Sequence, residues 1–313
     1  MTHRSLGAAL LAALVAGCSG GPDFDARHVP ACGEADANAL TAVDTNGDGA
    51  DEIAVTCMTQ TEPARGLAEI WRLDGDDGFA RSARHDVGTE DRGEGGHAVV
   101  AGDLDGDGRT DLAVADDGHH VHGISVLPGR EGGGFGPAVY HGHESYGMQS
   151  MRLLDADGDG HRDLVLPRYA AGMSSVFFIR AGEDGLDPGA DPERIEAARV
   201  SGLDPAPRAP VERRAIRLLR GDFDGAGGTD EFVLLETDGA PADRDTYRFH
   251  LWLADGGDGF TSPGAVELAD YPNRVAAGDF DGDGREDFAI LRIPRETGDA
   301  PLIVYLNRMS DSS

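Results

Sequence analysis

A nine-residue acidic segment constrains this chain more than any other feature. Its clearest copy, Asp-Leu-Asp-Gly-Asp-Gly-Arg-Thr-Asp at residues 103–111, runs directly into an apolar stretch at 112–114. Carboxylates at alternate positions of a tight turn repel one another at short range, and glycines allow the sharp turns that residues with a Cβ resist. A hard divalent cation removes the repulsion, and Ca²⁺ accepts about six to eight oxygen ligands from flexible loops. The segment therefore predicts a shortened, EF-hand-like calcium loop.

The segment occurs five times, with first positions at 44, 103, 155, 222 and 279. The expected ligands are the side chains at positions one, three, five and nine and the backbone carbonyl at position seven. In the four full copies these are Asp44, Asn46, Asp48, Ala50 and Glu52; Asp103, Asp105, Asp107, Arg109 and Asp111; Asp155, Asp157, Asp159, His161 and Asp163; and Asp279, Asp281, Asp283, Arg285 and Asp287. The fourth copy has Ala226 at position five, so a weak or empty site is expected from its remaining residues Asp222, Asp224, Gly228 and Asp230. We therefore expect four Ca²⁺ sites and a fifth, degenerate one.

Each acidic segment lies between two short apolar runs that lack a helical period, which indicates a β-hairpin with the acidic segment as its turn. A third apolar run and a Gly-rich turn follow in each copy, and intervals of this length are typical of repeat architectures. The unit is therefore expected to have four antiparallel strands. The third strands align at 70–73, 124–127, 177–180, 251–254 and 304–307.

The fourth strand of the last unit is missing after residues 304–307, whereas residues 23–29 match the turn and fourth strand of the complete units. Pairing the N-terminal strand into the last unit would explain both truncations and remove exposed sheet edges. The sequence thus predicts an all-β fold over residues 24–313. Its expected form is a five-bladed β-propeller of four-stranded antiparallel blades, closed by the N-terminal strand joining the last blade.

The repeated motif Asp-x-Asp/Asn-Gly-Asp-Gly-x-x-Asp, followed by an apolar strand, resembles the FG-GAP/VCBS repeats. These are the calcium-binding repeats of β-propellers like that of the integrin α-subunit. The turn Gly134-Phe-Gly-Pro137 also matches the family's name. The resemblance covers about residues 24–313. It implies blade-borne Ca²⁺ and a binding role, often adhesion, without fixing the ligand.

Residues 1–17 have the features of a signal peptide, with Arg4 before an apolar run at 6–15 that is too short to span a bilayer. Val15-Ala-Gly-Cys18 resembles the lipobox of bacterial lipoproteins, which makes Cys18 the expected lipidation site and residues 18–23 a tether. The alternative is an ordinary secretory signal with a coincidental cysteine. We expect an exported, membrane-anchored lipoprotein that faces the periplasm or the cell surface.

The formal net charge of −30, with 57 acidic residues against 27 basic ones, argues against a nucleic-acid partner. The sequence shows no Ser-His-Asp order, phosphate-binding glycine loop or His-Glu-x-x-His motif, so we expect no catalysis. The leading hypothesis is a monomeric module that binds a protein or a glycan at the cell envelope, through long loops opposite the acidic turns. One alternative is a hydrolase or lyase with a site in the propeller funnel.

A second alternative is a transition-metal binder, because six histidines are expected on the long-loop face and imidazole binds Zn²⁺ or Cu²⁺. They are His97, His119, His120, His122, His141 and His143. Solvated loop histidines are the competing interpretation. Trp71 and Trp252 align with Phe178 and Tyr305 on the third strands, so they are interpreted as core residues rather than as sugar-stacking platforms.

Cys32 and Cys57 are both expected at the long-loop end of the first unit. A disulfide between them is geometrically plausible in an exported protein. Two free buried thiols are the alternative.

Overall fold

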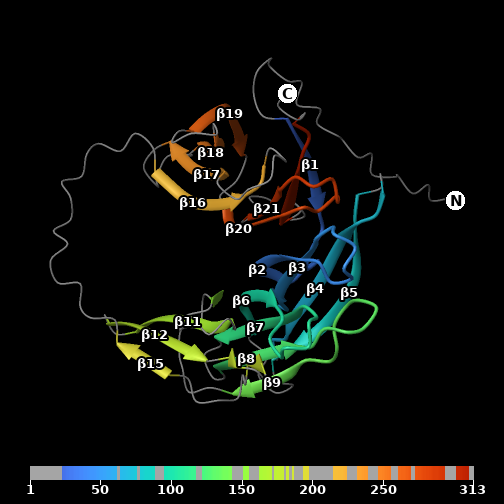
Figure 1. The fold of residues 1–313 in the computed structure, drawn as a ribbon, viewed down its shortest axis with the longest axis vertical. Coiled ribbons are helices and arrows are strands. Elements are labelled where there is room, and N and C mark those ends of the chain that lie inside the picture. Colours follow the sequence, from blue (N-terminus) through green and yellow to red (C-terminus); the bar gives the residue numbers. More distant parts are fainter. Residues whose placement is uncertain are drawn as a thin grey trace, which may run out of the picture.

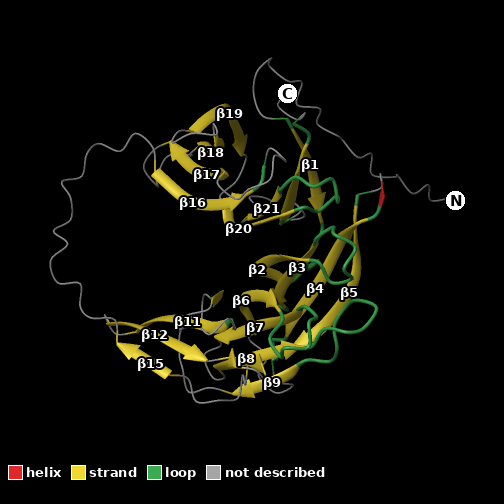
Figure 2. Ribbon diagram, in the orientation of Figure 1, coloured by secondary structure: helices red, strands yellow, loops and turns green. Residues whose placement is uncertain are grey.

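The computed structural model describes 17 segments of the chain. They are residues 23–61, 64–75, 78–88, 95–117, 122–142, 151–154, 162–170, 173–179, 181–182, 185–186, 193–196, 214–223, 231–238, 246–254, 260–268, 272–292 and 301–309. Strands make up nearly all the regular structure of these segments (Figure 2). None of the segments contains a helix with the length and hydropathy needed to cross a membrane. The predicted signal peptide, residues 1–17, and Cys18 lie outside the described residues.

The described strands form five four-stranded antiparallel sheets and one two-stranded ribbon. The first sheet comprises β2 (Asp36–Val43), β3 (Glu52–Met58), β4 (Gly66–Leu73) and β5 (Phe79–Val87). The second comprises β6 (Gly95–Gly102), β7 (Asp111–Asp117), β8 (His122–Leu127) and β9 (Val139–Gly142). The third comprises β10 (Arg152–Leu154), β11 (Asp163–Ala170), β12 (Met173–Ile179) and β15 (Glu193–Glu196), and the ribbon comprises β13 (Ala181–Gly182) and β14 (Gly185–Leu186).

The fourth sheet comprises β16 (Arg214–Gly221), β17 (Glu231–Asp238), β18 (Thr246–Ala254) and β19 (Phe260–Leu268). The last sheet has the order β1-β22-β21-β20, with β20 (Pro272–Gly278), β21 (Asp287–Arg292), β22 (Leu302–Asn307) and β1 (Phe24–Val29). Antiparallel pairing between β1 and β22 runs from Phe24 opposite Asn307 to Val29 opposite Leu302. The predicted pairing of the N-terminal strand with the C-terminal hairpin is therefore confirmed.

The sheets follow one another along an arc (Figure 1). The strand that begins each repeat unit is innermost, and these strands are β2, β6, β10, β16 and β20. Among them, β2 contacts both β6 and β20, β20 contacts β16, and β6 contacts β10. In the described part of the chain, the acidic segments that follow these strands lie at the same end of neighbouring sheets, as the backbone bonds from Asp51 to Asp279 and from Glu286 to Asp222 show. This arrangement positions the candidate site.

Hydrophobic cores lie between neighbouring sheets rather than inside any one of them. The core between the first and last sheets contains Trp71, Cys57 and Leu302, and the core between the last and fourth sheets contains Phe249 and Tyr305. Each central strand is thus covered on both faces, which is why β22 is buried at every position. Trp71 and Tyr305 are core residues as predicted, with 6% and 8% of their surface exposed.

Candidate metal centres in the acidic loops

The acidic loop at 103–111 is coiled by hydrogen bonds from its own backbone to its own carboxylates. Asp103 accepts the N–H groups of Gly106 and Gly108, with N–O distances of 2.8 and 2.9 Å, and Asp105 accepts the N–H of Asp107 at 3.1 Å. Gly106 and Gly108 have φ angles of 77° and 82°, a region that strains residues with a Cβ. Local sequence alone therefore produces the tight turn.

The loops at 44–52 and 279–287 repeat this geometry. Asp44 accepts the N–H groups of the glycines at positions four and six, at 2.7 and 3.1 Å. Asp279 accepts the corresponding N–H groups at 2.7 and 2.8 Å. Three independent copies of the sequence thus give the same turn.

In three of the loops, the ninth-position carboxylate ties the loop to the third strand of its own sheet. Asp111, Asp163 and Asp287 are at most 1% exposed. Each accepts a backbone N–H from just beyond or at the end of the third strand. The pairs are Asp111 with Gly129 at 2.6 Å, Asp163 with Ala181 at 2.9 Å and Asp287 with Asn307 at 2.6 Å. The ninth residue is therefore both a structural link and a candidate ligand.

The second loop position anchors the turn in the core, a role that was not assigned from the sequence. Leu104, Phe223 and Phe280 occupy it in three copies, and all are at most 2% exposed. The signal was present as an apolar residue between two aspartates. An apolar residue within a loop of oxygen donors does not by itself indicate a buried anchor.

Carboxylates converge in two of the described loops. One oxygen from each of Asp103, Asp105 and Asp111 lies within 4.8 Å of the others, and the same holds for Asp279, Asp281 and Asp287. A hard, oxygen-preferring cation such as Ca²⁺ suits such a donor set.

The loop at 279–287 also carries an oxygen that points to a cation. Asp281 Oδ1 is buried and makes no hydrogen bond within the described structure, while Oδ2 accepts a hydrogen bond from Arg308 at 2.5 Å. A buried carboxylate oxygen without a partner is costly, and a bound cation would satisfy it. The residues present therefore fit a calcium ion.

Electrostatics at these loops favour a cation for a second reason. Burial raises the pKa of Asp287 to about 8, with the charges of Asp281 and Asp279 adding to the shift while hydrogen bonds from Asn307 and Phe280 oppose it. Burial likewise raises the pKa of Asp111. The folded loops thus bring carboxyl groups together in a setting that disfavours their charge, and either a proton or a cation relieves this.

Neighbouring loops are linked across sheets. The N–H of Asp51 donates to the carbonyl of Asp279 at 2.6 Å, and the N–H of Glu286 donates to that of Asp222 at 2.8 Å. Burial raises the pKa of Asp51 to about 6 and that of Glu286 to about 7. Position eight therefore joins one loop to the next.

The first loop differs in its side-chain contacts. Asn46 Nδ2 donates to Glu52 Oε1 at 3.1 Å, and Glu52 Oε2 accepts both the N–H and the hydroxyl of Thr45, at 2.9 and 2.6 Å. The longer Glu52 side chain therefore contacts its own loop instead of the third strand. Binding of a cation through Asn46 would require its amide oxygen to face the ion.

The remaining predicted ligands fall largely outside the described residues. These are Asp155, Asp157, Asp159 and His161 of the third loop and Asp224, Gly228 and Asp230 of the fourth.

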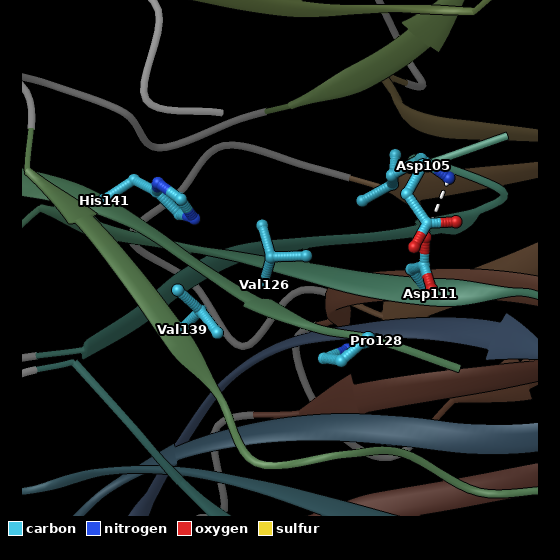
Figure 3. A pocket seen from close by; sticks show the side chains of 7 residues that line it. Asp105, Asp111, Val126, Pro128, Val139 and His141 are labelled. Atoms are coloured by element: carbon cyan, nitrogen blue, oxygen red, sulfur yellow. Dashed lines mark hydrogen bonds between the residues drawn. The ribbon is translucent and has the colours of Figure 1, made fainter. Parts of the chain in front are cut away.

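The described histidines are not brought together. His97 lies on β6 and His141 on β9, the two opposite edges of one sheet. His141 lines an apolar pocket of about 160 Å³ with Val126 and Val139, which separate it from Asp105 and Asp111 (Figure 3). His122 lies on β8, and His119, His120 and His143 lie outside the described residues. Among the described residues, no histidine belongs to a potential metal cluster.

Cys32 and Cys57 form a disulfide with an S–S distance of 2.00 Å. Beside it lies Glu69, which is 1% exposed and was not singled out from the sequence. Its carboxylate accepts the N–H of Cys32 at 2.9 Å, Trp71 Nε1 at 3.1 Å and Arg81 at 2.5 Å. Trp71 lies two residues away on β4 and Arg81 lies on the neighbouring strand β5, whereas Cys32 is 37 residues away in sequence. No local pattern marks Glu69 as the acceptor that joins these groups.

Comparison with known proteins identifies the repeat. The family model described as an FG-GAP-like repeat matches residues 44–114 and 103–166. Each match starts at the first position of an acidic loop. It ends in the strand that directly follows the next acidic loop, which is β7 for the first match and β11 for the second. No curated protein matches the chain significantly. The chain therefore contains FG-GAP-like repeats, which the two matches place within residues 44–166.

Proposed function

We propose that this protein is a calcium-binding β-propeller that acts as a binding module at the cell envelope. The observation that carries the proposal is the convergence of Asp279, Asp281 and Asp287 around the buried, unpartnered oxygen of Asp281. The same backbone coil recurs in the loops at 44–52 and 103–111. The FG-GAP-like repeats within residues 44–166 support a binding module of the β-propeller type.

Calcium here has a structural role. Asp111, Asp163 and Asp287 already link their loops to a third strand, so an ion at such a loop would stiffen the contact between the hairpin and its sheet. Anything that binds only the folded state raises its stability by mass action. Extracellular-type sites bind Ca²⁺ at about 10⁻⁴–10⁻³ M, so the midpoint of thermal unfolding should rise in millimolar Ca²⁺.

Ion counting tests the calcium proposal. Equilibrium dialysis of the wild type should give about four ions per chain, and Asp105→Ala should lose about one. Asp224→Ala, in the degenerate fourth loop, is the matched control and should lose little. Wild-type protein that binds no Ca²⁺ at saturating concentration would end the proposal.

The proposed form is a five-bladed ring closed by β1, with residues 24–313 as one domain. The pairing of β1 with β22, which completes the last sheet with the N-terminal strand, supports closure. Small-angle scattering separates a closed ring from an open array. A profile that fits only an elongated arc would refute closure.

We propose that the partner is a protein or a glycan, bound by a lipid-anchored monomer that catalyses nothing. Metabolic labelling with a fatty acid should mark the wild type and not Cys18→Ser. A periplasmic pulldown and a glycan array, each run with Ca²⁺ and with EDTA, test the partner. Turnover in a hydrolase or lyase screen would instead favour an enzyme.

A further inference from the structure

The junction between the first two acidic loops departs from the pattern of the other described junctions. Elsewhere the position-eight N–H donates to the position-one carbonyl of the adjacent loop, as Asp51 does to Asp279. In the second loop, position eight is Thr110. Within the described structure its N–H makes no such bond to Asp44, and a cavity of about 490 Å³ lies between the two loops. Cavities of about 300–1,000 Å³ accommodate small ligands.

The third wall of this cavity is a glycine-rich turn between β8 and β9. Gly134 donates its N–H to the carbonyl of Thr45 at 3.1 Å, and Arg130 donates its N–H to the carbonyl of Gly134 at 3.0 Å. Gly133 has a φ of 95°, and a Cβ placed on it would lie 2.9 Å from Cβ of Asn46. The turn is thus closed on itself and packed on the first loop, so the cavity has a defined shape.

Three polar side chains on the cavity wall are available to a ligand. Arg130 and Glu131 are exposed, and Thr110 is half-buried. Within the described part of the chain, none of the three has an ion pair or a side-chain hydrogen bond. Arg109, by contrast, already pairs with Asp107 and donates to the carbonyl of Gly129.

The chemistry of the wall selects one class of ligand. An apolar molecule would leave these polar groups without partners. A simple cation would face Arg109 and Arg130, and a simple anion would face Asp44 and Glu131. A ligand with hydroxyl groups for Thr110 and Glu131, and one carboxylate for the planar guanidinium of Arg130, satisfies all of them.

We propose that this cavity binds an acidic saccharide. This inference rests on the proposed function, because Ca²⁺ in the first loop would neutralise Asp44 and so remove the repulsion of the ligand's carboxylate. Binding should therefore require Ca²⁺. The inference narrows the proposed glycan partner to acidic saccharides. It places their site at the acidic-loop end of the molecule, not on the long-loop face expected from topology.

A glycan array tests the proposal. Uronate- and sialate-bearing glycans are printed beside their neutral counterparts and probed with the full chain in millimolar Ca²⁺ or in EDTA. Acidic glycans should bind at least about tenfold more tightly than the neutral ones, and only with Ca²⁺. Arg130→Gln should weaken binding about tenfold or more, and Thr110→Val about threefold. Arg72→Gln, an exposed arginine on β4 outside the cavity, should match the wild type.

Calcium stoichiometry, measured on every variant, separates the two proposals. Unchanged ion binding with no acidic glycan captured would overturn the saccharide site and leave the calcium proposal standing. Equal binding of acidic and neutral glycans, or full binding by Arg130→Gln, would also overturn it. Wild-type protein that binds no Ca²⁺ would count against the calcium proposal itself.

Discussion

Calcium binding at the loop 279–287 should depend steeply on pH. Asp287 is fully buried and its pKa is raised from 3.8 to about 8. A calcium ligand must be deprotonated, so binding has to displace this proton. Below pH 8 the apparent affinity of this loop should fall about tenfold for each pH unit.

In the calcium-free protein, the pH dependence of stability that Asp287 causes is opposite in sign to that of an ordinary paired aspartate. Because the folded-state pKa lies above the unfolded value, the folded chain binds the proton more tightly. The stability that Asp287 contributes is present below about pH 3.8 and is lost as the pH rises through about 8. Ca²⁺ should restore it, so the stabilising effect of Ca²⁺ should grow with pH across this window.

Isothermal titration calorimetry at pH 7, in buffers of different ionisation enthalpy, measures the number of protons released per Ca²⁺ bound. A pKa of about 8 implies that about 0.9 protons leave this loop with each ion bound. Asp281→Ala, which removes a ligand of the same loop, should reduce total proton release by that amount. Equal calcium affinity at pH 6 and pH 8.5, or proton release unaffected by Asp281→Ala, would refute the reasoning.

Three further predictions concern stability, and each can be measured by urea unfolding without Ca²⁺. Replacing Cys32 and Cys57 by serine should cost about 3 kcal/mol through loop-closure entropy, and a reducing agent should have the same effect on the wild type alone. Glu69→Ala should cost about 3–5 kcal/mol because it leaves buried donors without an acceptor, and a loss below about 1 kcal/mol would contradict this role. Gly133→Ala should cost about 2–4 kcal/mol through strain and a clash, against about 1 kcal/mol for Gly132→Ala, whose Cβ would meet open space.

Much of the fold could be predicted because its signals are local and repeated. Strand positions follow from short apolar runs, and the pairing of β1 with β22 follows from counting strands per unit. The coil of each acidic loop is also local. Its hydrogen bonds join residues two to five positions apart, as in Asp103 with Gly106 and Gly108. Such contacts form wherever the motif occurs.

The sequence by itself therefore determined the repeated hairpin, its oxygen-rich turn and the strand that the N-terminus supplies. Only tertiary structure decided how each of these is used. Burial against the third strand raises the pKa of Asp287, and the fold brings the N–H of Cys32, 37 residues away in sequence, to the carboxylate of Glu69. The cavity beside Thr110 lies at a junction without the backbone contact that the two other described junctions make. The physical reason is that burial and junction geometry depend on neighbours distant in the chain, which no spacing of residues records.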